Sequence, residues 1–237
     1  TMLVAEGART HFIYFHDGVP SKVRSSDQVA HLGEVLLELG LSTAAQVDQA
    51  LRVTLPSGQL HGRHLVQQGQ LDVGSVKAAL SWQLVRKMTH LFTFPSDTRW
   101  AYYEGVNLLD DYGGPELTPA EPLAVIMAGV RMLGSSPVVE QTLARLGSAP
   151  LRLRREAEIG RFMLRDDERR AVDVLRARPA GMRDLLQKDV SDERTVKLVI
   201  YALVITRCLN LGAEQRLPVG HGRPTIDLPQ LRQVDEP

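Results

Sequence analysis

The feature that most constrains this sequence is a repeat, because the stretch from Ala30 to Gln83 carries one residue pattern twice, 29 positions apart. Each copy predicts a short amphipathic helix, a glycine just past its end, and a second helix. Neither helix pair could bury its apolar face alone, so we expect the two copies to pack on each other. The identical positions are Gly33/Gly62, Leu36/Leu65, Gly40/Gly69, Val47/Val76, Ala50/Ala79 and Leu51/Leu80. We therefore expect both leucines of the first helices to be buried and the glycines at 40 and 69 to follow helix ends.

Short β-rich runs flank the repeat and predict a small antiparallel sheet. A turn signal at Asp17-Gly18 connects the second expected strand to the third. The expected strands are 2–5, 10–16, 20–24 and 99–103. The expected helices at the two ends of the repeat are 29–39, capped by Ser26, and 73–94.

The composition changes at 105–122, which contains the run Asp110-Asp111-Tyr112-Gly113-Gly114-Pro115, and this predicts a linker. Six helices and one short strand are expected after it, and the last three helices have the spacing of a winged-helix core. The fold class is α+β, a small antiparallel sheet with a duplicated helix-pair unit followed by a mainly helical, winged-helix-like domain. The expected domains are 1–105, expected to lack N-terminal residues, a linker at 106–121, a helical domain at 122–212 and an irregular tail at 213–237. The expected helices of the second domain are 122–133, 137–146, 157–163, 166–177, 181–188 and 191–210, and the strand is 151–154.

Composition and residue patterning argue against several classes of function. The 28 Lys and Arg residues balance the 28 Asp and Glu residues, so the chain lacks the basic footprint of a nucleic-acid-binding protein. The run from Leu198 to Ile205 is almost entirely apolar, which favours a buried helix over one that reads a DNA groove. The single cysteine, Cys208, rules out an internal disulfide and suits a reducing, cytoplasmic compartment. No apolar stretch has transmembrane length, so no membrane insertion is expected.

The sequence contains no strong catalytic or metal-binding motif. His61 and His64 have a spacing that could hold a metal, but no carboxylate or thiolate lies nearby in register. Asp110 and Asp111 stand in a Gly/Pro-rich segment, where adjacent acids are normally solvated. We therefore expect no enzyme activity, no catalytic residues, no metal site and no cofactor.

Four stretches resemble the PATAN domain family of bacterial signalling proteins: His11–Pro20, Leu32–Leu36, Trp82–Lys87 and Leu91–Pro95. The resemblance covers about residues 1 to 105. It implies a non-enzymatic signalling or regulatory module that acts through protein–protein interaction in motility, polarity or development. The implied partner is another signalling or motility protein, and a homodimer is left open.

The duplicated helix pair is also similar to the N-terminal domain of type II secretion and pilus assembly ATPases, whose paired motifs bind cyclic di-GMP. That motif opens with Arg-Leu-Gly and ends with Gln, whereas this chain has His31-Leu32-Gly33 and Leu60-His61-Gly62, closed by Thr54 and Gln83. The resemblance makes a cyclic di-GMP sensor one alternative function, and a DNA-binding transcriptional regulator is the other. Because both arginines are missing, we expect no tight binding of the dinucleotide. The candidate ligand residues are His31, Gly33, Gly62 and Gln83.

Overall fold

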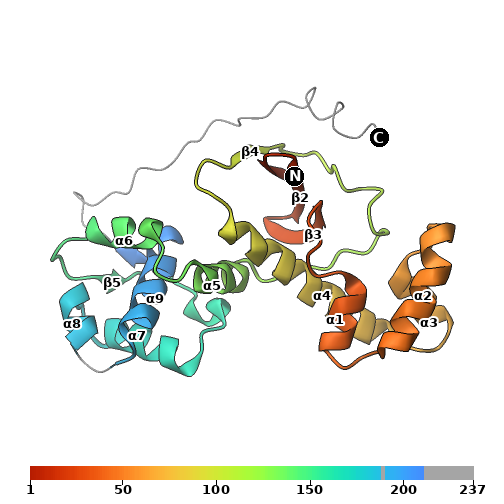
Figure 1. Cartoon of the computed structure of the whole chain (residues 1–237). Helices are drawn as coiled ribbons and strands as arrows, with labels where there is room; N and C mark the ends of the chain where they lie inside the picture. The colour runs from red at the N-terminus through yellow and green to blue at the C-terminus, as the bar shows by residue number, and fades with distance from the viewer. Residues whose placement is uncertain (188–189, 211–237) are drawn as a thin grey trace. The chain divides into compact units, whose positions relative to one another are not determined.

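The computed structural model describes residues 1–187 and 190–210 (Figure 1). These residues divide into two compact units at the Ala120–Glu121 bond, and each is treated separately below. The tail predicted at 213–237 lies outside the described residues. The α+β fold class and the antiparallel sheet are confirmed.

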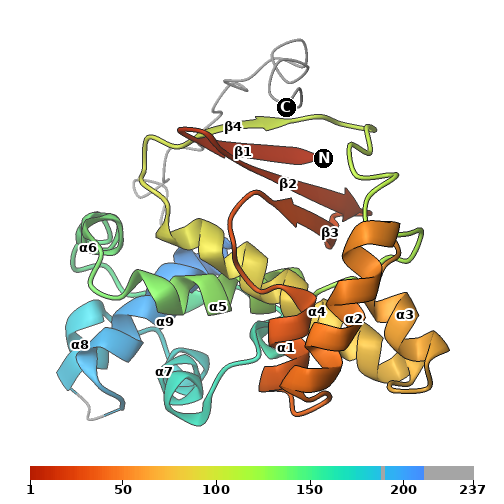
Figure 2. The ribbon, with the colours of Figure 1, turned by 45° about the vertical axis from the view of Figure 1, so that its right-hand side comes forward.

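The first unit contains a four-stranded antiparallel sheet in the order β3-β2-β1-β4 (Figure 2). Asp17 and Gly18 both adopt positive φ between β2 and β3, as a tight hairpin turn requires. Leu3, Ile13 and Ala101 have no exposed surface and form part of the core of this unit. The strands are β1 (Met2–Glu6), β2 (Arg9–His16), β3 (Val19–Ser25) and β4 (Arg99–Tyr102).

The duplicated stretch forms two helix pairs whose equivalent helices begin 29 residues apart. The first pair is α1 (Leu32–Glu38) and α2 (Ala44–Ser57), and the second is α3 (His61–Gln67) and α4 (Val73–His90). The packing is reciprocal, because α1 packs on α4 and α2 packs on α3. Leu36, Ala50, Leu65 and Ala79 meet in one buried cluster, so the predicted mutual packing of the two copies is confirmed.

The glycines at 40 and 69 end the first helix of each pair in the same way. Both have φ near +65°, a conformation that costs glycine little. The amide of Gly40 donates to Leu37 O, and that of Gly69 donates to Val66 O. The predicted helix ends are confirmed at both positions.

Two boundaries near the repeat differ from prediction. The first helix begins at Leu32, not at residue 29, because Ala30 has φ +51° and breaks the helical path. The helix expected at 73–94 ends at His90 and continues as a single 3₁₀ turn, η1 (Leu91–Thr93).

Residues 106–120, which we call the strap, are not a free linker as predicted. Leu109 is 1% exposed, and the amides of Thr118 and Ala120 donate to Ser21 O and Pro20 O on β3. The strap is therefore part of the first unit. Its glycines and prolines shape turns in a segment that is packed against the sheet.

The second unit is built around α9 (Glu193–Ile205), which packs against each of the four other α-helices. Prolines at the first positions of α5 and α6 follow the capping residues Glu121 and Ser136, as is typical of helix starts. The other elements are α5 (Pro122–Leu133), α6 (Pro137–Ala144), β5 (Arg152–Leu153), η2 (Ile159–Phe162), α7 (Asp166–Ala177), α8 (Met182–Gln187) and β6 (Leu209–Asn210).

Two predictions in this unit are wrong. The segment expected to be helical at 157–163 forms only the 3₁₀ turn η2. The last helix ends at Ile205 instead of 210, because Arg207 has positive φ and the next residues pair as β6 with β5. Within the described residues, no single helix is both long and apolar enough to cross a membrane; α5 and α6 pass that test only as a pair bent by 107°.

Candidate functional site

A cavity of about 590 Å³ lies against the second helix pair, inside the first unit. Its walls come from α3 and α4, from β3, from the strap and, through Leu32, from the start of α1. Its volume falls within the range of small-molecule sites, which are mostly apolar with a few polar groups. The aliphatic side chains that line it are Val23, Leu32, Leu60, Val66, Val73, Val76, Leu80, Leu84 and Leu117.

The structure brings together two of the four residues predicted to contact a cyclic dinucleotide. Gly62 and Gln83 line the cavity, whereas His31 and Gly33 do not. Gln83 Nε2 already donates to the carbonyl oxygen of Ala30, at 2.7 Å. His31 is exposed before the first turn of α1, and its ring contacts Gln28 Oε1 at 2.9 Å. The four residues therefore do not form one site.

The paired glycines have a packing role. A Cβ atom on Gly33 would lie 2.6 Å from Val47 Cγ1, and one on Gly62 would lie 2.8 Å from Val76 Cγ1. Only glycine lets the two helices of each pair approach this closely. The repeat of these glycines is thus explained by helix packing.

His61 occupies the position equivalent to Leu32, and its ring lines the cavity. Both ring nitrogens are buried and have no hydrogen-bond partner among the described residues. Burial lowers the pKa of His61, and the nearby His64 lowers it further. The ring is therefore neutral near pH 7 and keeps one unpaired N–H donor.

Sequence reasoning missed the cations of this cavity. Arg63 and Lys77 line it from the helices, and Lys22 lines it from β3. Lys22 is only 8% exposed, and among the described residues its ammonium donates to the carbonyl oxygens of Leu109, Asp110, Tyr112 and Gly114 at 2.7–3.4 Å. These contacts join residues 87 to 92 positions apart in the sequence, so no local pattern could reveal them.

The first helix pair has a face on α2 that is equivalent to the cavity-lining face of α4. Asp48, Leu51 and Leu55 on α2 are equivalent to Lys77, Leu80 and Leu84 on α4, which line the cavity. Leu84 is 2% exposed, whereas Leu55 is 75% exposed. Leu51 and Leu80 are both half-buried, so the two faces differ at Leu55, which is solvent-accessible where its equivalent Leu84 is covered.

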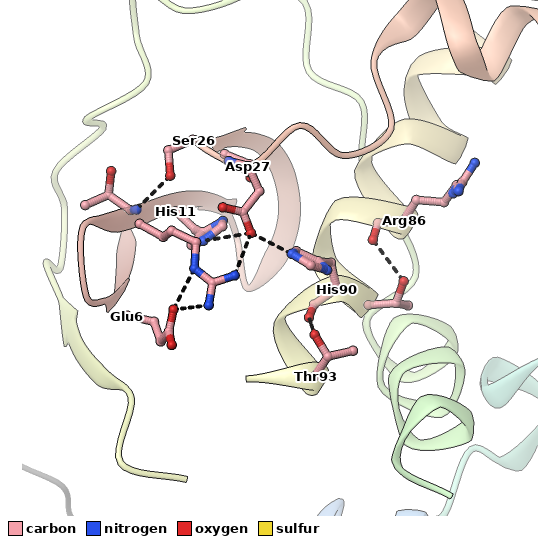
Figure 3. Close-up of polar contacts among 11 residues, drawn as sticks. Glu6, His11, Ser26, Asp27, Arg86, His90 and Thr93 are labelled. Carbon is pink, nitrogen blue, oxygen red and sulfur yellow. Dashed lines mark hydrogen bonds and ion pairs between the residues drawn. The ribbon is translucent and has the colours of Figure 1, made fainter. Parts of the chain in front are cut away.

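A second polar cluster joins β2, the segment after β3 and the end of α4 (Figure 3). Asp27 Oδ2 lies 2.7 Å from His90 Nε2 and 3.9 Å from His11 Nε2. His11 is 1% exposed, and burial lowers its pKa although Asp27 acts in the opposite direction. Arg9 reaches Asp27 at 3.6 Å and also pairs with Glu6. The cluster ties the sheet to α4.

Metal binding and DNA binding were the other two kinds of site considered in the sequence, and the described part of the chain gives little evidence for either. There, no three His, Cys, Asp or Glu side chains are grouped so that they could hold a metal. On α9, eight residues from Val196 to Val204 are buried, which leaves few side chains free to reach base edges. Comparison of the chain with family models, with curated proteins and with solved structures gives no match.

Proposed function

We propose that this chain is a non-enzymatic bacterial signalling module that binds another protein through the open face of its first helix pair. The observation that carries the proposal is the contrast between Leu55, 75% exposed, and its covered equivalent Leu84, 2% exposed. Contiguous exposed apolar surface with a polar rim is typical of protein-interaction sites. The PATAN resemblance points to the same class of function and to a partner in motility, polarity or development.

The second helix pair indicates what kind of segment would cover the first. There, a β-strand and the extended strap lie over Leu80 and Leu84. On the first pair, Asp48 and Glu34 are exposed beside the equivalent leucines. A matching partner segment would be extended, with apolar side chains for Leu51 and Leu55 and a basic side chain for the carboxylates.

The test is affinity capture of the full chain from its native cell, comparing the wild type with Leu55→Asp. Leu55 is largely solvated, so the change should leave folding intact. The matched control is Met132→Asp, which alters a side chain 60% exposed on α5. We expect a defined partner to be lost with Leu55→Asp and retained with Met132→Asp. Identical captured proteins in all three samples would contradict the proposal.

A cyclic di-GMP sensor is the second candidate, because Gly62 and Gln83 line one cavity. The absent arginines and the engagement of Gln83 by Ala30 argue for weak binding at most. Calorimetry with cyclic di-GMP should give no sub-micromolar dissociation constant. Introducing an arginine into the cavity lining by Leu60→Arg should strengthen any weak binding, since a guanidinium group pairs bidentately with phosphate. A sub-micromolar constant for the wild type would favour the sensor.

A further inference from the structure

The cavity beside α3 and α4 combines aliphatic walls with an excess of positive charge. Its helix walls carry Arg63 and Lys77, and its floor on β3 carries Lys22. The strap contributes the carboxylates of Asp111 and Glu116. The helical side therefore carries two cations, and aliphatic side chains line the cavity from the helices, from β3 and from the strap.

Lys22 adds to this positive character in an unusual way. Buried charges in proteins are normally paired with an opposite charge. The hydrogen bonds that the Lys22 ammonium makes within the described residues all go to neutral carbonyl groups. These dipoles solvate the charge without neutralising it, so Lys22 adds to the positive potential of the adjacent cavity and favours an anion there.

The buried imidazole of His61 is a third feature that favours a bound ligand. Its ring nitrogens are buried without partners in the described structure, and such groups are costly unless something satisfies them. A neutral imidazole has one N–H donor. A small rotation of the ring toward the cavity would let that N–H donate to an acceptor placed there.

We propose that this cavity binds a small amphipathic anion, an aliphatic chain that carries one carboxylate. The chain would lie along the leucines and valines of α3, α4 and the strap. The carboxylate would face Arg63 and Lys77. This binding is independent of the protein partner proposed for Leu55, because that residue does not line the cavity.

The test is calorimetric titration of the full chain with three compounds that share one alkyl chain: decanoate, decanol and decylamine. We expect decanoate to bind at least about tenfold more tightly than decylamine, as one favourable charge interaction provides. The affinity for decanol should lie between those for decanoate and decylamine. Equal affinities for all three would show a non-specific apolar surface and overturn the proposal, as would the absence of decanoate binding.

Two pairs of variants locate the site, and the repeat supplies their controls. Val66→Phe fills the cavity, whereas Leu37→Phe places the same ring at the equivalent position, which is 41% exposed. Lys77→Gln removes a cation on the surface of α4, and Asp48→Asn is its equivalent on α2. We expect roughly tenfold weaker decanoate binding for Val66→Phe, and a reduced preference for decanoate over decylamine for Lys77→Gln. Both controls, Leu37→Phe and Asp48→Asn, should bind decanoate with the affinity and the preference over decylamine of the wild type.

Circular dichroism shows whether each variant keeps its fold. If Val66→Phe does not fold, the pair Lys77→Gln and Asp48→Asn still tests where decanoate binds. Both residues are exposed, so these substitutions should leave the fold intact. Decanoate binding that is unchanged in Lys77→Gln, or equally weakened in both members of that pair, would place the anion elsewhere and contradict the proposal.

Discussion

A Cβ atom on Gly62 would lie 2.8 Å from Val76 Cγ1, and the equivalent pair, Gly33 and Val47, repeats this contact at 2.6 Å. This close contact predicts how replacing either glycine by alanine changes the stability of the protein. Although alanine normally favours a helix over glycine, Gly62→Ala and Gly33→Ala should each destabilise the protein by about 1–3 kcal/mol through overpacking. The measurement is urea unfolding. Gly160→Ala is the control, because a Cβ there meets no atom within 4 Å, and it should change stability little.

Leu84 and Leu55 give the second prediction, because they are equivalent positions with opposite burial. Leu84→Ala should lower the free energy of unfolding by about 2–5 kcal/mol, through lost burial and the cavity it leaves. Leu55→Ala should change it by less than about 0.5 kcal/mol, as is usual for surface positions. Similar losses for the two variants would mean that the first helix pair is covered in solution.

The buried histidines give a pH prediction. Burial lowers the pKa of His61 and of His11 in the folded chain, so the unfolded chain binds protons more readily. Their contribution to stability is complete above the ordinary histidine pKa of 6.5 and is lost as the pH falls below it. The free energy of unfolding should therefore be lower at about pH 5.5 than at about pH 7.5.

His61→Leu tests this origin, because leucine is the residue at the equivalent position 32. Relative to the wild type, the variant should gain most stability at acidic pH. Its free energy of unfolding should therefore fall less between the higher and the lower pH. A free energy of unfolding that falls as much with pH in the variant as in the wild type would assign the pH dependence to another group, with His11 as the first to examine.

Arg131 and Glu168 provide a prediction for the second unit. Glu168 is 4% exposed and accepts two hydrogen bonds from the Arg131 guanidinium, each 2.7 Å long. Burial alone would raise the pKa of Glu168, but hydrogen bonds from Arg131 and from the Arg165 amide outweigh it and hold the pKa below its ordinary value. The stability they provide is present above that ordinary value and is lost as the pH falls through the folded pKa.

Arg131→Ala should therefore cost about 3–5 kcal/mol, because it leaves a buried carboxylate unpaired. Replacing both partners, Arg131→Met with Glu168→Leu, should recover most of the loss. The measurement is chemical unfolding at neutral pH. A double variant as unstable as Arg131→Ala would show that the ion pair itself, more than the unpaired charge, determines stability.

Local sequence patterns predict much of this fold because its signals are local. Helix ends at Gly40 and Gly69 and the hairpin turn at Asp17-Gly18 depend on residues a few positions apart. The repeat is also visible in the sequence, as one pattern that returns after 29 positions. The sequence predicts a linker at the strap because its glycines and prolines are visible locally, whereas the contacts of Lys22 and Leu109 that hold it against the sheet are not. The candidate site was only half predictable for the same reason, since its cations meet through the packing of distant elements.

The most direct test of the central claim, that the open face of the first helix pair binds a protein, is photo-crosslinking in the native cell. The photoreactive residue p-benzoylphenylalanine would replace Leu55 in the full chain, and Met132 in the control. We expect irradiation to give a discrete adduct with a second protein from position 55 and not from position 132. No adduct from position 55, or the same adducts from both positions, would contradict the claim.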